Sequence, residues 1–262
     1  MLETRYLKPF IPFTSIHQSI FPIVCIVYWF TYGIDWTTFL FATIFGWAYF
    51  NFFTEIVIHR IFAHNTIPIK NNILKGLLSI FSMYGVGTAP ASFGIMHQKH
   101  HVYADTYRDT HSPNHLGIKV LSFFFHKKFE DRDFEGKTGM KFMALSRHLV
   151  TDKTIMFVQR ISMPLLILPL IAIPYFFSVD TLVNWYMWPM AISVNCLLPP
   201  ILNHSGWLGG TIPEKQTFSA HARNNFIGNW INPFARNHGT HHSVLWKDRT
   251  DEFLIKYLKD RI

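Results

Sequence analysis

Residues 36–64 read WTTFLFATIFGWAYFNFFTEIVIHRIFAH, and this stretch decides how the chain is interpreted. Its first part, 36–54, contains no charged residue and is rich in aromatic side chains. A membrane-spanning helix needs about 20 mostly apolar residues, so this run is long enough to cross a bilayer. The stretch ends with Glu55, His59 and His64. A membrane span with two histidines at its end predicts a membrane protein that has a polar site at one face of the membrane.

The composition of the 262-residue chain agrees with this interpretation. Charged residues make up 15% of the chain, against roughly 25% in an ordinary soluble domain, and the mean hydropathy is +0.16. A disordered chain is excluded, because it would need low hydrophobicity and high charge. A disulfide-stapled secreted domain is excluded as well, because the only cysteines are Cys25 and Cys196. A soluble enzyme is disfavoured, because the charged residues are too few to form a polar surface around so apolar a chain.

Three further runs without charged residues are long enough to cross a membrane. The four predicted spans lie at about 18–34, 36–58, 161–179 and 181–203. Only Asp35 separates the first pair and only Asp180 the second, so each pair is predicted to form a tight hairpin. We therefore expect an all-α membrane protein in which 1–262 is a single integral-membrane domain. Another uncharged run, 76–96, is interrupted by glycines and a proline, and we interpret it as a helix in or dipping into the membrane interface.

The basic residues predict which side of the membrane each part faces. Of the 24 lysines and arginines, two precede the first hairpin, fourteen lie at 60–160 and eight at 215–261. None lies within a hairpin or its turn. Because short cytoplasmic segments carry an excess of Lys and Arg, both termini and the middle segment are predicted to be cytoplasmic. The membrane would be a bacterial inner membrane, or the endoplasmic reticulum in a eukaryote.

Nine of the fifteen histidines collect at this predicted face. They form HRIFAH at 59–64, HQKHH at 97–101, HGTHH at 238–242, and a single histidine after the fourth span. On a helix, histidines three and four residues apart project from one face. Neutral imidazole binds Fe, Zn, Cu and Ni alike, and nine ligands exceed what one ion needs. The predicted ligands of two metal ions, in a helical cap at the cytoplasmic ends of the spans, are His59, His64, His97, His100, His101, His204, His238, His241 and His242.

Not all histidines have this spacing. His59 and His64 are five residues apart and cannot share a face of a straight α-helix. We therefore expect them to bind different metals or to flank a helix end. His17, His115, His126, His148 and His221 have no ligand spacing and are interpreted as ordinary interfacial residues.

The three motifs resemble the histidine boxes of membrane fatty-acyl desaturases, and the four-residue gap in the first box is similar to the acyl-CoA delta-nine branch. Residues 104–106 (ADT) and 109–113 (DTHSP) are similar to the S-D-T and D-P-H-S-P of that branch. Residues 223–225 (RNN) resemble a bacterial S-R-N-N stretch before the third box, and His204 matches a lone histidine after the last span. The resemblance runs from about 55 to 242, which is most of the chain.

The resemblance implies an oxidoreductase that uses two iron ions and O2 to place a double bond in a long acyl chain. The acyl chain would be linked to CoA, a carrier or a lipid. Electrons would come from a separate protein, such as a ferredoxin or a b-type cytochrome, because the chain has no nucleotide-binding or C-x-x-C motif of its own. Zinc can replace iron in overproduced protein, since imidazole does not exclude it. Membrane lipids are expected partners and nucleic acid is not.

Three positions depart from the family pattern. The family usually has Asn four residues before the lone histidine, where this chain has Pro200, with Asn203 as the nearest substitute. It usually has G-E-G before the third box, where 234–236 read FAR, and Arg-Asp before the second box, where 95–96 read IM. Hydroxylation, or oxidation of a fatty acid to a terminal alkene, therefore stays open on the same scaffold. A metal transporter is a weaker alternative, because it predicts ligands at mid-membrane.

Further candidates lie beside the predicted ligands. Glu55 is one helical turn before His59 and is expected to accept its imidazole N–H, although it could instead face Arg60 or lipid headgroups. The other candidates for positions next to the metal ligands are Asn203, Asp109 and His111.

A short charged stretch carries the candidates for docking a phosphate-bearing carrier or an acidic electron donor. They are Lys127, Lys128 and Arg132. The alternative is a solvated surface close to anionic lipid.

Overall fold

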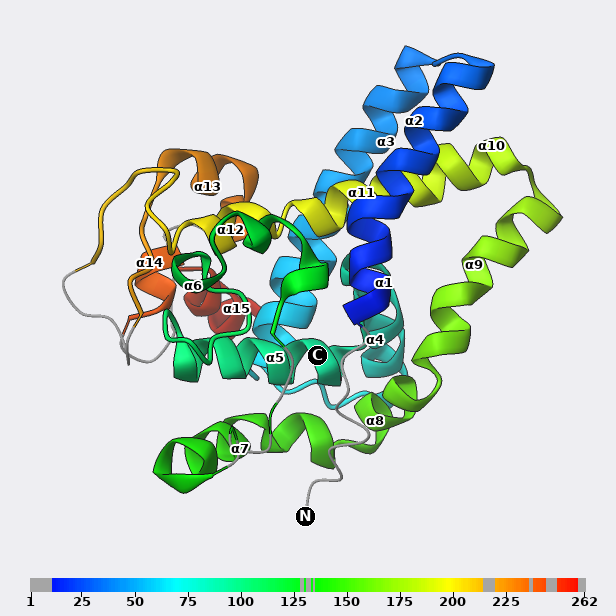
Figure 1. The fold of residues 1–262 in the computed structure, drawn as a ribbon. Coiled ribbons are helices and arrows are strands. Elements are labelled where there is room, and N and C mark those ends of the chain that lie inside the picture. Colours follow the sequence, from blue (N-terminus) through cyan, green and yellow to red (C-terminus); the bar gives the residue numbers. More distant parts are fainter. Residues whose placement is uncertain are drawn as a thin grey trace.

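The computed structural model describes residues 11–127, 130, 133, 135–213, 220–235, 238–243 and 249–258. Within these ranges the regular structure is helical, apart from one isolated β-bridge between Thr211 and Asn224. The predicted all-α class is therefore confirmed for the described residues. Two helical hairpins rise from one side of the molecule, and shorter helices form a cap beneath them (Figure 1).

The first hairpin consists of two long helices. The helical segments are α1 (Ile11–Ser15), η2 (Ile16–Ile20), α2 (Phe21–Tyr32), α3 (Trp36–Tyr49) and η3 (Phe50–Ala63). The runs Phe13–Tyr32 and Trp36–Ala63 are both long and apolar enough to cross a membrane. The second run extends past the predicted end at residue 58, because η3 continues as a π-helix with i→i+5 hydrogen bonds.

The turn between these helices is determined by local sequence. Gly33 ends α2 with a φ of +88°, a conformation that residues with a side chain rarely adopt. The Asp35 carboxylate accepts the backbone N–H of Thr37 at 3.0 Å and the hydroxyl of Thr38 at 2.7 Å, which caps α3. The predicted boundary at Asp35 is therefore the observed one.

The second hairpin is less regular than predicted. Its segments are α8 (Lys153–Arg160), α9 (Ser162–Phe176), α10 (Val179–Leu182), η7 (Val183–Met187), α11 (Trp188–Asn195) and α12 (Leu198–Leu202). Helices α8 and α9 meet at a bend of 54° and count as one span only if they are taken together. The predicted fourth span, 181–203, runs through α10, η7 and α11 and is interrupted between Asn195 and Leu198, where α12 begins. Length and composition thus support two membrane-crossing helices, or three with the bent pair, among the described residues.

The two hairpins pack closely against each other. A Cβ atom on Gly46 of α3 would lie 2.6 Å from the carbonyl oxygen of Pro189 in α11, so only glycine fits at this crossing. Side-chain hydrogen bonds also join the hairpins. For example, Trp29 Nε1 donates to Asn184 at 2.8 Å, and Trp188 Nε1 donates to the Thr43 hydroxyl at 2.8 Å. Small residues and polar bonds of this kind are typical of helix contacts within membranes.

The outer surface of these helices is apolar. The strongly exposed side chains include Phe30, Trp36, Phe41, Ile171 and Phe176. A soluble monomer rarely exposes a large continuous apolar surface. Together with the two long apolar helices, this surface indicates a membrane protein.

The cap begins after η3. Its next elements are α4 (Asn72–Val86), α5 (Pro90–Tyr103), α6 (Pro113–Leu116), η4 (Gly117–Leu121), η5 (Phe123–Phe125) and α7 (Gly136–Thr151). The run 76–96, predicted as one helix, is two helices, because Gly87 adopts a left-handed conformation with a φ of +66° and ends α4. Helix α5 then packs against both η3 and α7, which buries the second histidine motif.

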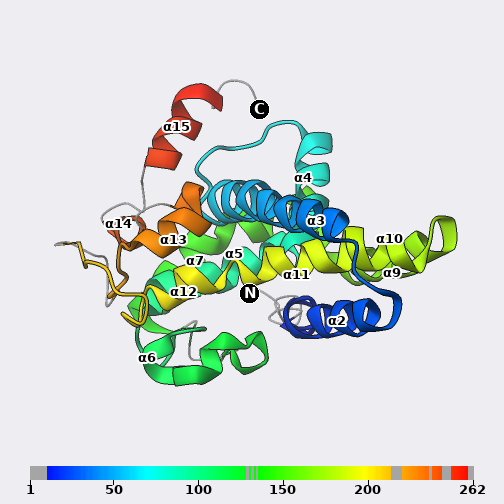
Figure 2. The same cartoon turned by 90° about the horizontal axis from the view of Figure 1, so that it is seen from above.

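The C-terminal part closes the cap. It contains α13 (Phe226–Ile231), η8 (Pro233–Ala235), α14 (His238–His241) and α15 (Arg249–Leu258). Helix α15 is fastened to the end of η3 by Arg60, whose guanidinium donates to the Asp251 carboxylate at 2.7 Å in a fully buried ion pair. The view from above shows α13 beside the end of the long α3–η3 helix, with α14 next to α13 (Figure 2). The third histidine motif therefore meets the first two in the cap.

Candidate metal centre

The nine predicted histidines form two groups, and each group could hold a metal ion. In each group, one ring nitrogen per histidine lies within 4.8 Å of all the others. Group one is His59, His64, His97, His101 and His241. Group two is His100, His204, His238 and His242. The groups adjoin, because the rings of His101 and His242 stack with centroids 4.3 Å apart.

Each H-x-x-H-H motif is shared between the two groups. In the second motif, His97 and His101 belong to group one and His100 to group two. In the third motif the division is reversed, since only His241 joins group one and the remaining two histidines join group two. Residues four apart lie on one face of a helix. The two histidines that are four residues apart in each motif therefore belong to the same group. The histidine between them belongs to the other group.

His59 and His64 lie in the same group, which corrects one of the two alternatives expected from their spacing. The expectation assumed a straight α-helix, in which residues five apart lie about 140° apart. Here η3 is a π-helix, and the His64 N–H donates to the His59 carbonyl at 3.0 Å, an i→i+5 bond. The other alternative, that the pair flanks a helix end, agrees with the structure, because His64 follows the last residue of η3.

The Nε2 atoms of these histidines face one another at short distances. His64 and His97 are 2.8 Å apart, and His97 and His101 are 2.9 Å apart, measured between Nε2 atoms. For a metal–nitrogen distance of about 2.1 Å, neighbouring ligands at right angles would be about 3.0 Å apart. The donor set thus has the spacing of ligands around a common ion.

In the described part of the chain, His59, His100 and His204 each have the other ring nitrogen fixed by a carboxylate. His59 Nδ1 lies 2.9 Å from Glu55, His100 Nδ1 lies 2.9 Å from Asp109, and His204 Nδ1 lies 2.8 Å from Asp105. A carboxylate only accepts, so each Nδ1 carries the proton and each Nε2 of a neutral ring presents a lone pair. The lone pair of His204 faces His238 Nε2 at 3.2 Å. A cation between such nitrogens would remove the repulsion between them.

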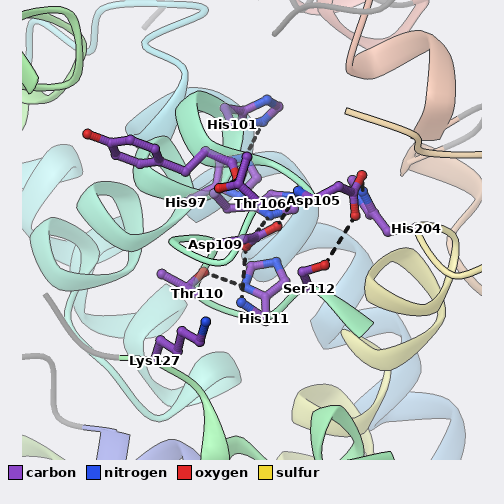
Figure 3. Close-up of polar contacts among 12 residues, drawn as sticks. His97, His101, Asp105, Thr106, Asp109, Thr110, His111, Ser112, Lys127 and His204 are labelled. Atoms are coloured by element: carbon purple, nitrogen blue, oxygen red, sulfur yellow. Dashed lines mark hydrogen bonds and ion pairs between the residues drawn. The ribbon is translucent and has the colours of Figure 1, made fainter. Parts of the chain in front are cut away.

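Asp105 is the carboxylate that the sequence interpretation left without a role. Besides His204, it accepts the backbone N–H of His221 at 2.7 Å and the side-chain amide of Asn114 at 3.1 Å. Its φ of +58° is uncommon for a residue with a side chain. Figure 3 shows Asp105 and Asp109 on the loop that follows the second histidine motif. The signal was present in the ADT stretch, but a single acid has no spacing that identifies its partner.

The electrostatic surroundings keep most of these imidazoles neutral. Burial, followed by the charge of neighbouring histidines, lowers the pKa well below 6.5 for His97, His101, His238, His241 and His242. His100 differs: burial again opposes its charge, but the Asp109 carboxylate outweighs this and raises the pKa. Because only the neutral imidazole binds a metal ion, the set is suited to metal at neutral pH.

A largely apolar pocket opens directly onto the histidines. It encloses about 880 Å³ of space not filled by atoms, including its open side. Histidines of both groups line it, His59 and His97 from group one and His100 and His238 from group two. The apolar lining includes Val86, Phe93, Phe123, Leu197 and Ile201. An apolar molecule in this pocket would lie beside both groups.

The remaining candidates have different surroundings. The His111 ring stacks on His100 with centroids 4.1 Å apart and lines the pocket. The Asn203 side chain accepts a hydrogen bond from Asn225, on the side of α13. The Lys127 ammonium donates to the carbonyl of Tyr107. Lys128 and Arg132 lie outside the described residues.

His126 has a position that its spacing did not predict. It is buried, it lines the pocket, and its Nε2 donates to the Val120 carbonyl at 3.1 Å. Its ring also stacks on His111 with centroids 5.5 Å apart. Burial lowers the pKa of His126 to about 4, so the ring is neutral at physiological pH. The rings of His100, His111 and His126 thus form one continuous stack.

No protein-family model matches the chain, and no curated protein sequence is significantly similar to it. The two histidine groups and the pocket between them are therefore the basis for any assignment of function.

Proposed function

We propose that the protein is an oxygen-dependent di-iron oxidase that introduces a carbon–carbon double bond into a long acyl chain. The observation that carries this proposal is the position of one apolar pocket against histidines of both groups. The three histidine motifs, which resemble those of membrane fatty-acyl desaturases, support the same assignment. Bound iron would supply the oxidation of unactivated C–H bonds by O2.

The residues of the chain would bind and orient the substrate. Val86, Phe93 and Leu197 offer apolar contacts suited to methylene groups. Because the described residues that line the pocket include no lysine or arginine, the pocket favours the hydrocarbon part of a substrate over a phosphate or carboxylate group. Positioning of the chain against the centre would select the carbon atoms that react.

The carboxylates would hold the metal ligands in place. Glu55, Asp105 and Asp109 each bind an Nδ1 proton and leave Nε2 available as a ligand. Such partners fix ring orientation and increase the basicity of the ligand. Both iron ions would then sit at the end of the Trp36–Ala63 helix, which favours an oxidase over a transporter with ligands along a mid-membrane path.

The proposed topology is four membrane crossings, with both termini and the metal centre in the cytoplasm. It rests on the uncharged runs and on the distribution of lysine and arginine. A separate redox protein would supply electrons, and membrane lipids would surround the hairpins.

The experiment is a mass-spectrometric profile of fatty acids and hydrocarbons in aerated host membranes, in which wild type is compared with His101→Ala. A new double bond with wild type, absent with His101→Ala and absent without oxygen, is the expected result. Metal analysis of protein produced in iron-rich medium should give about two iron ions per chain, whereas protein produced without added iron should contain zinc.

Other results would contradict the proposal. Equal product from His101→Ala, or turnover without oxygen, would eliminate the di-iron oxidase. A new hydroxyl group or terminal alkene in place of an internal double bond would retain the metal centre but assign a different reaction on it.

A further inference from the structure

Helix α13 and its flanks form an apolar segment that belongs to none of the predicted spans. Residues 224–235 contain no charged residue and lie between Arg223 and Arg236. Within α13, Phe226 is 81% exposed, Trp230 is 75% exposed and Ile227 is 47% exposed. Residues at i, i+1 and i+4 lie on one side of a helix, so these three side chains form one apolar face. The opposite side, at Gly228, is buried.

The inner side of α13 is held against the first hairpin. Trp47 Nε1, on α3, donates to the carbonyl of Ile231 at 2.7 Å, and the Asn51 side chain donates to the same carbonyl at 3.5 Å. The Asn232 side chain donates to the Cys196 carbonyl at 3.2 Å. Figure 1 shows α13 next to α12, and Figure 2 shows it beside the end of the α3–η3 helix.

The contact with α3 fixes the depth of α13. At about 1.5 Å per residue, Trp47 and Asn51 lie about 16 and 22 Å along the helix from Trp36. The hydrocarbon layer of a bilayer is about 30 Å thick. If it starts near Trp36, where the polar turn ends, both residues lie inside it. The exposed face of α13 is then at a depth that lipid chains occupy.

Backbone groups at both ends of α13 and in the following η8 have the protein partners that this environment requires. A polar backbone group in contact with lipid has no water to bind, so it needs a partner within the protein. At the start of the helix, Asn225 Oδ1 accepts the Gly228 N–H at 2.6 Å. At its end, the Ile231 carbonyl has the Trp47 and Asn51 bonds, and the Phe234 carbonyl accepts from Arg60 at 3.1 Å. Side chains thus take over bonds that water would make at an ordinary surface helix.

We propose that α13 is inserted in the hydrocarbon layer beside α3, with Phe226, Ile227 and Trp230 in contact with lipid acyl chains. The C-terminal segment therefore re-enters the bilayer before it delivers the third histidine motif to the cap. The ligand is the bilayer itself, and its surface is continuous with the exposed apolar face of α3. This inference does not depend on the reaction that the metal centre performs.

The test is the depth of spin labels in liposomes of phosphatidylethanolamine and phosphatidylglycerol. Phe226→Cys and Trp230→Cys are each labelled in a background in which Cys25 and Cys196 are replaced by alanine. Phe30→Cys on α2 is the lipid-exposed reference, and Lys137→Cys on α7 is the solvent-exposed reference. Power-saturation EPR then compares collisions with O2, which is concentrated in lipid, with those of a water-soluble nickel chelate.

Insertion predicts that labels at 226 and 230 collide severalfold more with O2 than with the nickel chelate, as at position 30, and opposite to position 137. Two independent positions guard against a local effect of one label. Both replaced side chains are exposed, so the fold should persist, and unchanged metal content of each variant would verify this. Greater access to the nickel chelate at both positions would overturn the proposal and place α13 in water.

Discussion

The two histidine groups are made from the same three motifs, yet they are supported differently. Among the residues that the structure describes, group one has five histidines and one carboxylate partner, Glu55 on His59. Within the same residues, group two has four histidines and two carboxylate partners, Asp109 on His100 and Asp105 on His204. Group two thus has one histidine fewer and one carboxylate partner more than group one.

The carboxylate partners of the two groups also lie in different kinds of structure. Glu55 lies on the same helix as His59, so a regular backbone aligns the pair. Asp105 and Asp109 lie on an irregular loop that is held by its own hydrogen bonds, including Ser112 to Asp105 at 3.3 Å (Figure 3). Group one therefore depends on helix geometry and group two on loop geometry. The two metal positions are expected to differ in affinity.

Removal of a ligand should have the largest effect. His101→Ala takes one nitrogen from group one, and we expect metal content to fall from about two to about one per chain, with no product above background. His204→Ala should do the same through group two. Metal analysis and activity of membrane-inserted protein measure both, with Lys137→Ala as a control on the exposed surface of α7. If either variant lost both metals, the groups would be one cooperative unit and the comparison would fail.

Removal of a carboxylate partner should have an intermediate effect. Loss of such a partner typically weakens metal binding about 10–100-fold. We expect Asp105→Asn to release one metal to a chelator at concentrations that leave the other in place, and Glu55→Gln to release the opposite one. Chelator titration of each variant measures the effect.

A double variant identifies the group concerned. In His64→Ala, which lacks a group one ligand, the remaining metal should become labile when Asp105→Asn is added but stay tightly bound when Glu55→Gln is added. Equal lability in both combinations would show that the carboxylates do not distinguish the groups.

These assignments show where the sequence was informative. Six of the nine histidines were predicted from H-x-x-H-H spacing, which follows from helix geometry. His59, His64 and His204 were predicted from their place at the same membrane face, and the structure brings all nine together. The turns predicted at Asp35 and Asp180 lie at or near the observed helix caps, Asp35 before α3 and Ser178 before α10, because caps are local features. The all-α class followed from long apolar runs without strand alternation.

Other features depended on contacts between distant parts of the chain. Which histidine joins which group follows from how α5 faces α14, and Asp105 lies 99 residues from His204 in sequence. The π-helix was missed because composition does not distinguish i→i+4 from i→i+5 bonding. His126 was missed because it lines the pocket through burial and not through ligand spacing. The break between α11 and α12 was also missed, because it interrupts a run that is apolar throughout.

Acid should have the smallest effect, and it should act near group two. His126 stacks on His111, which stacks on His100. Its pKa is about 4 in the folded protein against 6.5 in an exposed chain, so the unfolded state binds the proton first as pH falls. Stability is therefore full above pH 6.5 and declines between 6.5 and about 4, by at most about 3 kcal/mol for this group.

His126→Gln should flatten this part of the pH dependence. Thermal unfolding in detergent between pH 7.5 and 5 measures it, and the unfolding temperature of the variant should fall less than that of wild type. An identical decline in both proteins would mean that His126 is not a source of acid sensitivity on the group two side.

The π-helix at Phe50–Ala63 makes the number of residues in this segment a constraint in its own right. Each i→i+5 bond accommodates one residue more than an α-helical turn would. A deletion of one residue between Phe50 and His59 would allow this part of the segment to relax toward α-helix. It would rotate His59 and His64 together relative to α3 and to the other histidines, although every ligand would still be present in the sequence. During evolution, substitutions in this segment would be far more acceptable than insertions or deletions. The number of residues in this segment therefore helps to determine whether the metal ligands come together.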